Sequence, residues 1–238
     1  MKHITIILLL LQLTINCRAQ SNDIKNASRL LQQVQKAYTE QNFLSFSVSY
    51  HLTATGVADS LKGNIKMSGN NYLIDLDSSL TIHTGIKTIV LFKEDKLLYV
   101  TKGSNGAEAV MPLAITDSSF YKKIAQTEVK TTTEVREITI TFKEGQPYKK
   151  MLLTVDRTTN FISLISYAVP ATMLQQATNN ETLQNLPAGS EAFIEIAFEG
   201  YDKNAFDTSV FNEDNYYKND GNVLVPGDAF ADYTVYGE

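Results

Sequence analysis

The feature that most constrains the fold of this chain is an alternation of apolar and polar residues that returns along most of its length. Phe46, Val48, Tyr50 and Leu52 alternate with serine and histidine side chains. Because successive side chains of a β-strand point to opposite faces, this spacing gives the strand one apolar and one polar face. The same alternation, or a short apolar run between turn residues, marks the segments 61–67, 72–76, 86–92, 97–101, 135–142, 149–156, 161–167 and 193–198. The chain is therefore predicted to be mainly β.

Short turns separate these segments. Gly69-Asn70-Asn71 favours a tight hairpin, because Gly and Asn tolerate the positive φ angles that such turns require. Further turn sequences lie at 93–96, 144–147 and 157–160. Strands joined by so few residues run antiparallel, so we predict a meander of one-sided antiparallel strands.

Three helices are predicted. The first is capped by Asp23 and has apolar residues at spacings of three and four. These residues are Ile24, Ala27, Leu31, Val34 and Tyr38. A short helix is expected between Pro112 and Gln126, where alternation lapses, with caps at 116–119, and another from Met173 to Ala177.

The first nineteen residues have the anatomy of a cleavable signal peptide. Lys2 precedes an apolar run from Ile4 to Leu11, which is too short for a membrane span, and cleavage is expected after Ala19. The alternative is a lipoprotein anchored at Cys17, against which Asn16 argues, since lipoprotein signals usually carry a small residue there. We predict a periplasmic or secreted protein with one domain over 20–238.

Composition limits what the exported protein can do. Cys17 is the chain's single cysteine, so its removal with the signal peptide leaves neither disulfides nor thiol chemistry. Without Lys2 and Arg18, 19 of the 21 basic residues stand against 26 acidic ones. A net negative chain opposes phosphate backbones, so no nucleic acid partner is expected. Three histidines, one of them in the signal peptide, leave little material for a metal site.

No catalytic pattern stands out. Asp75 and Asp77 alternate away from Tyr72, Ile74 and Leu76, and we interpret them as solvated sheet surface rather than a catalytic pair. His51 and His83 are interpreted as surface histidines. The sequence has neither a nucleophile elbow nor a phosphate-binding glycine loop. We therefore predict a binding protein that is not an enzyme and has no cofactor.

The order of these elements resembles the LolA-like family of periplasmic outer-membrane lipoprotein carriers. The resemblance is carried by residues 27–48, by 63–67 with the following Tyr72, by the hairpin 90–99, and by the closing segment 196–216. In the family, an Arg after the second of these stretches ties a helical lid to the barrel. Ser68 and Gly69 occupy the matching positions here, and the aromatic tail 219–238 has no firm counterpart.

The resemblance implies an incomplete antiparallel β-barrel, a strongly curved sheet with an N-terminal helix and short covering helices. Its apolar face is expected to hold the acyl chains of lipids or lipoproteins. The candidate lining residues are Phe46, Val48, Tyr50, Ile65, Met67, Ile74, Leu76, Leu91, Ile140, Phe142, Ile194 and Ile196. The alternative is an envelope interaction or assembly protein that keeps the fold, fills its cavity and holds a protein partner with its surface or its tail.

Overall fold

The computed structural model describes residues 25–103, 118–177, 187, 189–221 and 223–237. The predicted signal peptide, Ile24 and the predicted caps at 116 and 117 lie outside these residues. The chain divides into two compact units. Unit 1 comprises residues up to 36, 53–57 and 115–195, and unit 2 comprises 37–52, 58–114 and 196–238. The prediction of a single domain stays a prediction.

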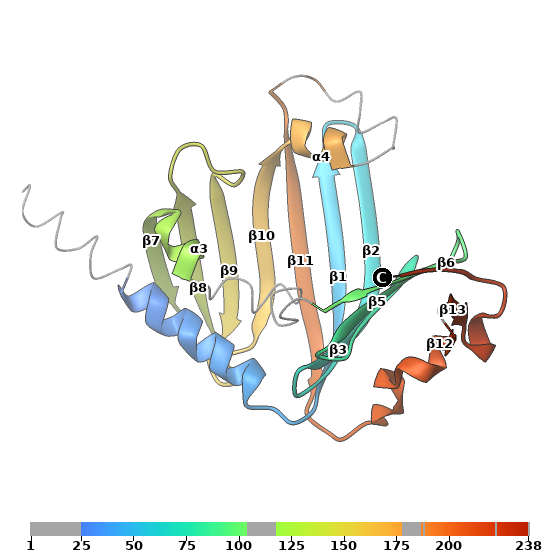
Figure 1. Ribbon diagram of the computed structural model, residues 1–238. Helices are drawn as coiled ribbons and strands as arrows, with labels where there is room; N and C mark the ends of the chain where they lie inside the picture. The colour runs from blue at the N-terminus through green and yellow to red at the C-terminus, as the bar shows by residue number, and fades with distance from the viewer. Residues whose placement is uncertain (1–24, 104–117, 178–186, 188, 222, 238) are drawn as a thin grey trace, which may run out of the picture. The chain divides into compact units, whose positions relative to one another are not determined.

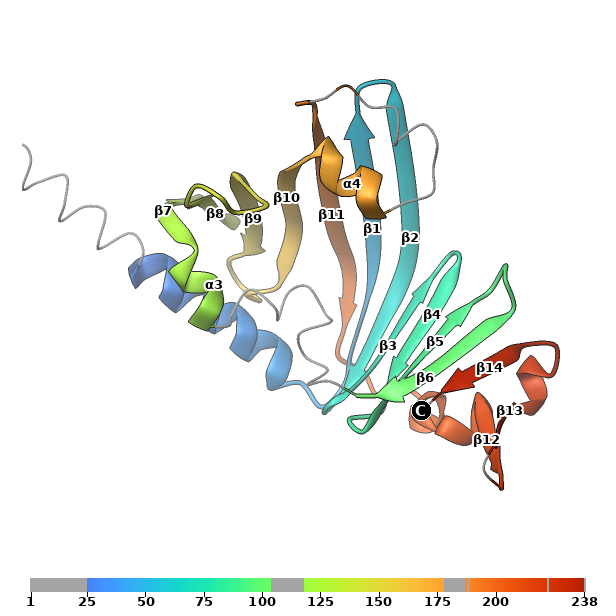
Figure 2. The same cartoon turned by 45° about the horizontal axis from the view of Figure 1, so that its top comes forward.

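Unit 2 holds most of the strands. They are β1 (Leu44–Ala54), β2 (Val57–Ser68), β3 (Asn71–Leu76), β4 (Ser79–His83), β5 (Lys87–Phe92), β6 (Leu97–Lys102), the later part of β11 (Glu191–Asp202), β12 (Tyr217–Asp220), β13 (Val223–Pro226) and β14 (Thr234–Gly237). Their hydrogen-bonding order is β14-β6-β5-β4-β3-β2-β1-β11, with β12 and β13 as a separate hairpin. Figure 2 shows β3 to β6 and β14 side by side.

Unit 1 holds four consecutive strands and the first residues of β11. These strands are β7 (Ile124–Thr131), β8 (Val135–Phe142), β9 (Lys150–Asp156) and β10 (Ile162–Pro170), and neighbours along the chain pair antiparallel. Their alternate residues are fully buried, among them Ile138, Ile140, Leu153 and Ile165. Figure 1 shows β8, β9 and β10 as adjacent strands.

The fold class predicted from the sequence is confirmed. Strands dominate, helices are few, and every consecutive pair from β2 to β6 and from β7 to β10 is antiparallel. Among the described strands, the sheet order begins at β14 and ends at β7, and these two ends do not pair. The sheet is therefore open, as an incomplete barrel requires.

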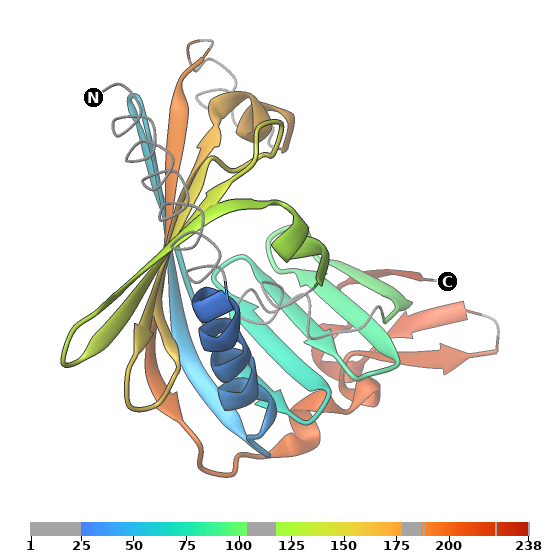
Figure 3. The same cartoon turned by 90° about the vertical axis from the view of Figure 1, so that its left-hand side faces the viewer.

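The first helix spans residues 25–39 and is continuous (Figure 3). Ala27, Leu31, Val34 and Tyr38 are buried along one stripe, as their spacing predicted. Within unit 2, the ring of Tyr38 packs edge-on against Phe46 with centroids 6.0 Å apart, and its hydroxyl lies 2.5 Å from that of Tyr201. The end of this helix is thus fixed to the strands of its own unit.

The other helices agree with prediction only in part. The helix α4 (Ala171–Ala177) contains the predicted 173–177 and begins two residues earlier. The predicted helix near residue 120 is α3 (Ser118–Lys122), and the expectation that it continues through Ile124 and Ala125 is wrong. Strand β7 begins at Ile124, because Ile124, Thr127 and Val129 pair with β8. The polar residues between them hid this strand from the sequence pattern.

A further strand was not predicted. Ser79–His83 forms β4, which pairs with β3 on one side and β5 on the other. The hairpin at Gly69 is confirmed, since Gly69 has φ 57° and joins β2 to β3. In the turn between β5 and β6, Lys96 takes the positive φ of 56°.

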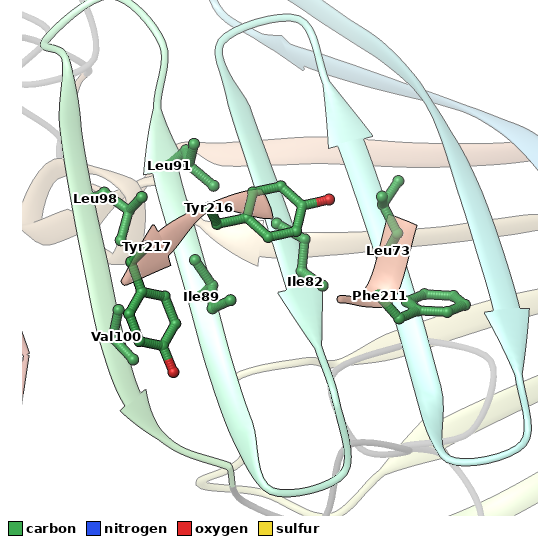
Figure 4. Packing of buried hydrophobic residues seen from close by; sticks show 9 residues of the cluster. All are labelled: Leu73, Ile82, Ile89, Leu91, Leu98, Val100, Phe211, Tyr216 and Tyr217. Atoms are coloured by element: carbon green, nitrogen blue, oxygen red, sulfur yellow. The ribbon is translucent and has the colours of Figure 1, made fainter. Parts of the chain in front are cut away.

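The C-terminal segment, residues 206–237, packs on the sheet through its aromatic side chains. Phe211, Tyr216 and Tyr217 are buried in one cluster with side chains of β3 to β6 (Figure 4). Those strand residues are Leu73, Ile82, Ile89, Leu91, Leu98 and Val100. We call the face that they form the covered face.

A polar network joins the same segment to the sheet. The Lys87 ammonium donates to the Tyr217 hydroxyl at 2.7 Å, and Tyr217 donates to Glu213. The Thr84 hydroxyl donates to the other oxygen of Glu213 at 2.7 Å. Burial alone would raise the pKa of Glu213, but the hydrogen bonds from Tyr217 and Thr84 and the charge of Lys87 outweigh it and lower that pKa.

Candidate functional site

The two faces of β3 to β6 differ in their chemistry. The register pairs Ile74 with Thr81, Thr81 with Val90, and Val90 with Tyr99, so these residues share a face. Leu91 pairs with Leu80 and Leu98 on the opposite, covered face. We call the face that contains Val90 the uncharged face.

No Asp, Glu, Lys or Arg occupies the uncharged face on the described strands β3 to β6 and β14. By register and alternation, its residues are Tyr72, Ile74, Leu76, Ser79, Thr81, His83, Thr88, Val90, Phe92, Leu97, Tyr99, Thr101, Thr234 and Tyr236. All are apolar, aromatic or hydroxyl-bearing except His83. None of these fourteen positions holds Asp, Glu, Lys or Arg, although β3, β5 and β6 carry such residues at their other positions.

Part of this face is solvent-exposed. Phe92, Tyr99 and Tyr236 are 41%, 38% and 49% exposed, although they are large and aromatic. Their rings form a row, with Phe92 edge-on to Tyr99 at 5.9 Å and Tyr99 stacked on Tyr236 at 5.2 Å. Val90 and Leu97 beside them are half-buried. This row, which we call the aromatic row, extends across β5, β6 and β14.

The row depends on an edge strand that the sequence did not reveal. Strand β14 pairs with β6 in parallel, which places Tyr236 opposite Tyr99 and Val235 on the covered face. Gly237 makes this approach possible, since a Cβ there would lie 2.3 Å from Leu224 Cδ1 and 3.1 Å from the Val100 carbonyl. The irregular aromatic spacing of the tail gave no sign of this strand.

The buried end of the uncharged face contains a histidine, which corrects the interpretation of His83 as a surface residue. His83 is 1% exposed and stacks on Tyr72 with centroids 4.9 Å apart. Its Nδ1 lies 3.0 Å from the Thr88 hydroxyl. Burial lowers the pKa of His83, so the ring is neutral at physiological pH. His51, by contrast, is exposed as predicted.

The predicted lining residues separate into three groups. In unit 2, Phe46, Val48, Ile65, Met67 and Ile196 are buried, while Tyr50, Ile74 and Leu76 are half-buried. The Ser47 hydroxyl donates to Asn64 at 3.0 Å, which places Ser47 on the side of Asn64 and turns Phe46 and Val48 toward the side of Ile65 and Met67. Burial raises the pKa of Tyr50.

The other lining residues lie elsewhere. Ile140 and Phe142 are buried in unit 1, where the Phe142 ring contacts Phe120 at 5.6 Å, and Ile194 is half-buried there. Leu91 is on the covered face, beneath the C-terminal segment, so it cannot line the same surface as Ile74. Val90, Phe92, Leu97, Tyr99 and Tyr236, which lie on the uncharged face, are not among the predicted lining residues. From the turn at 93–96 one could have predicted that Phe92 pairs with Leu97. Alternation alone, however, did not show which side of β5 is covered.

A polar hollow of about 440 Å³ lies over β1 to β3, on the side that carries Ser47, Asn64 and Asp75. Its charged lining residues are Lys62, Asp75, Asp77 and Lys93. Lys93 donates to Asp75 and to the Leu76 carbonyl, both at 2.6 Å, and the Lys62 backbone N–H donates to Asp77 at 3.1 Å. Asp75 and Asp77 therefore accept hydrogen bonds from the Lys93 ammonium and from the Lys62 backbone, respectively. No group of three metal-ligating side chains occurs among the described residues.

In the described part of the chain, no helix combines the length and apolar character that a membrane span requires. Comparison with family models gives no match, and none of the curated proteins matches. Among solved structures, an uncharacterized conserved protein from Thermus thermophilus is similar at a TM-score of 0.51 and 6% identity, over 90% of this chain and 99% of that one. The two chains therefore share a fold.

A LolA superfamily protein and a lipoprotein are also among the similar structures. A LolA superfamily protein from Nitrosomonas europaea has 11% identity and a TM-score of 0.36, over 78% of this chain and 96% of that one. The Mycobacterium tuberculosis lipoprotein LppX has 11% identity and a TM-score of 0.38, over 75% and 96%. These values describe similarity of fold only.

Proposed function

We propose that this protein is an exported, non-enzymatic carrier that holds acyl chains of lipids or lipoproteins against the uncharged face. The observation that carries the proposal is the partly exposed, charge-free surface around Val90, Phe92, Tyr99 and Tyr236. Large apolar side chains gathered in one exposed place mark binding sites more often than isolated ones do. The periplasmic or secreted location and the cleavage after Ala19 belong to the same proposal.

Apolar contact with this face would contribute free energy to acyl-chain binding. Burying a methylene group contributes about 0.8 kcal/mol, so ten methylenes laid on this face contribute about 8 kcal/mol before the cost of association. The covered face cannot supply this surface, because the C-terminal segment already occupies it. Ile65 and Met67 on β2 are buried core residues. The proposed ligand surface is therefore centred on β5, β6 and β14.

The test is binding of a fluorescent acyl probe by the purified protein and by two aspartate variants. Val90→Asp places a carboxylate on the uncharged face, and we expect probe binding to fall at least about tenfold, because a charge against an acyl chain loses its hydration. The matched control is Val223→Asp, since Val223 is 62% exposed and lies in the β12–β13 hairpin away from that face. The control should bind as the unmodified protein does.

Lipid extraction of protein purified from a bacterial host gives a second readout. We expect acyl chains to copurify. A protein that carries none and does not bind the probe would contradict the carrier proposal.

The alternative is an interaction protein of the cell envelope in which a protein partner covers the uncharged face. The aromatic tail 219–238 would contribute to this surface through Tyr236, whereas its Phe230, Tyr233 and Val235 pack against the cluster of the covered face. If the probe does not bind but Val90→Asp abolishes capture of a defined envelope protein, the alternative is supported.

A further inference from the structure

The lysine side chains around β2 to β6 contact partners on the covered side of the sheet. Lys66 lies over the ring of Phe206 at 5.5 Å, and Lys87 donates to Tyr217. Lys93 binds Asp75, and Lys96 pairs with Asp232 at 3.3 Å. Lys66, Lys87 and Lys96 therefore have partners in the C-terminal segment, and Lys93 has its partner on β3.

The remaining charges near the uncharged face do not change this picture. Lys102 follows Leu98 and Val100 by alternation, so its register position is on the covered face. At the end of the sheet beside Phe92, the exposed turn residues Glu94 and Asp95 are acidic. A negatively charged group placed on the uncharged face would find no Lys or Arg on that face of the described strands β3 to β6 and β14.

The polar groups that the face does offer are neutral. Ser79, Thr81 and Thr88 contribute hydroxyls on β4 and β5, that of Thr88 lying 3.0 Å from His83 Nδ1, and Tyr99 and Tyr236 contribute phenols on β6 and β14. Such groups can donate to or accept from an ester, an amide or a hydroxyl. They do not balance the charge of a carboxylate or phosphate that has been taken out of water.

On the basis of the function proposed above, we infer that the ligand of this face is a neutral lipid, whose polar part is an uncharged ester, amide or hydroxyl. An anionic lipid such as a free fatty acid or an acidic phospholipid is disfavoured, because a charge held against this face is desolvated without a counter-charge. The buried His83 does not alter this selectivity, because it is held neutral and is already paired with Thr88.

The test compares two competitors of equal chain length, palmitic acid and methyl palmitate. Each competitor is delivered from cyclodextrin, and its displacement of a bound fluorescent acyl probe is measured. The pH is kept well above the carboxyl pKa so that the acid is ionised. We expect the ester to compete at least about tenfold better than the acid. If the acid competes as well as the ester, this inference is wrong while the carrier proposal stands. If the fluorescent probe itself does not bind, the carrier proposal fails.

A variant with an added cation on the uncharged face should change the preference for the ester in the direction of the acid. Thr101 is exposed, polar and on the uncharged face, so Thr101→Lys adds a cation there without disturbing the core. We expect this variant to narrow or reverse the preference for the ester. Val223→Lys, with its lysine in the β12–β13 hairpin, is the matched control and should keep the preference. An unchanged preference in Thr101→Lys would show that the charge of this face does not select the ligand.

Discussion

Leu91→Ala is expected to destabilise unit 2 strongly, although its neighbour Val90 can be shortened at little cost. Leu91 is 1% exposed and packs in the cluster that the C-terminal segment covers. Replacing a fully buried leucine with alanine costs about 2–5 kcal/mol, through lost burial and the cavity that remains. Because Leu91 lies between Leu80 and Leu98 in adjacent strands, which cannot move together to fill the space, we expect about 3 kcal/mol. Val90 is half-buried, and Val90→Ala should cost about 1 kcal/mol or less.

The assay is chemical denaturation followed by circular dichroism and tyrosine fluorescence, since the chain has no tryptophan. Hydrogen exchange of the β5 amides adds a measurement local to unit 2. Binding of the acyl probe should show the opposite order, with Val90→Ala weaker than the unmodified protein and Leu91→Ala unchanged at temperatures where it is folded. Equal loss of stability in the two variants, or a loss below about 1 kcal/mol for Leu91→Ala, would refute the assignment of these residues to opposite faces.

Three further predictions follow from single residues. Glu213→Gln should lower the free energy of unfolding by about 1–2 kcal/mol, since it weakens charge-assisted hydrogen bonds. Because the pKa of Glu213 is lowered in the folded protein, its contribution to stability is present above the ordinary value of 4.5 and is lost as the pH falls below it. Denaturation of both proteins as a function of pH would reveal this loss. The folded pKa of His83 is also lowered, so the unfolded chain binds more protons below pH 6.5 and stability should fall as the pH drops through that value; His83→Phe should remove this slope, and an identical slope in the variant would count against it. Tyr236→Ala should weaken binding of the acyl probe severalfold by removing the stack on Tyr99, with little change in denaturation midpoint because Tyr236 is half-exposed; a large loss of stability would instead indicate a structural role.

The sequence predicted the strands well wherever one face of a strand is polar. In β8, Ile138, Ile140 and Phe142 are buried and the intervening threonines are not, as the alternation indicated. The hairpin at Gly69 was equally clear, since its turn chemistry is local. In these cases a few adjacent residues contain all the information that decides the structure.

Alternation does not decide a strand that is apolar on both faces. In β5, Ile89 and Leu91 face one way and Val90 and Phe92 the other, so either pair could have lined a ligand surface. The choice is made by the C-terminal segment, far along the chain, whose docking cannot be read from local periodicity. This is why Leu91 was assigned to the lining and Val90 was not.

The burial of His83 was missed for a related reason. Its partners Tyr72 and Thr88 come from the two adjacent strands, and their alignment depends on the register of β4, which the pattern did not reveal. Gly103 also contributes, since a Cβ at that position would lie 2.7 Å from the His83 ring. A neutral stacked histidine is thus a product of tertiary structure.

The docked C-terminal segment also explains how β3 to β6 can be apolar on both sides. Exposing both faces of such strands to water would favour aggregation, and an unpaired edge would add to that risk. The segment removes both problems, because its aromatic residues seal the covered face and β14 pairs with the edge of β6. Its rings and carboxylates contact Lys66, Lys87 and Lys96, two of which, Lys66 and Lys87, the strand register already places on the covered side. The segment therefore provides partners for the cations of the covered side, while the alternation of the strands leaves the surface proposed to bind lipid uncharged.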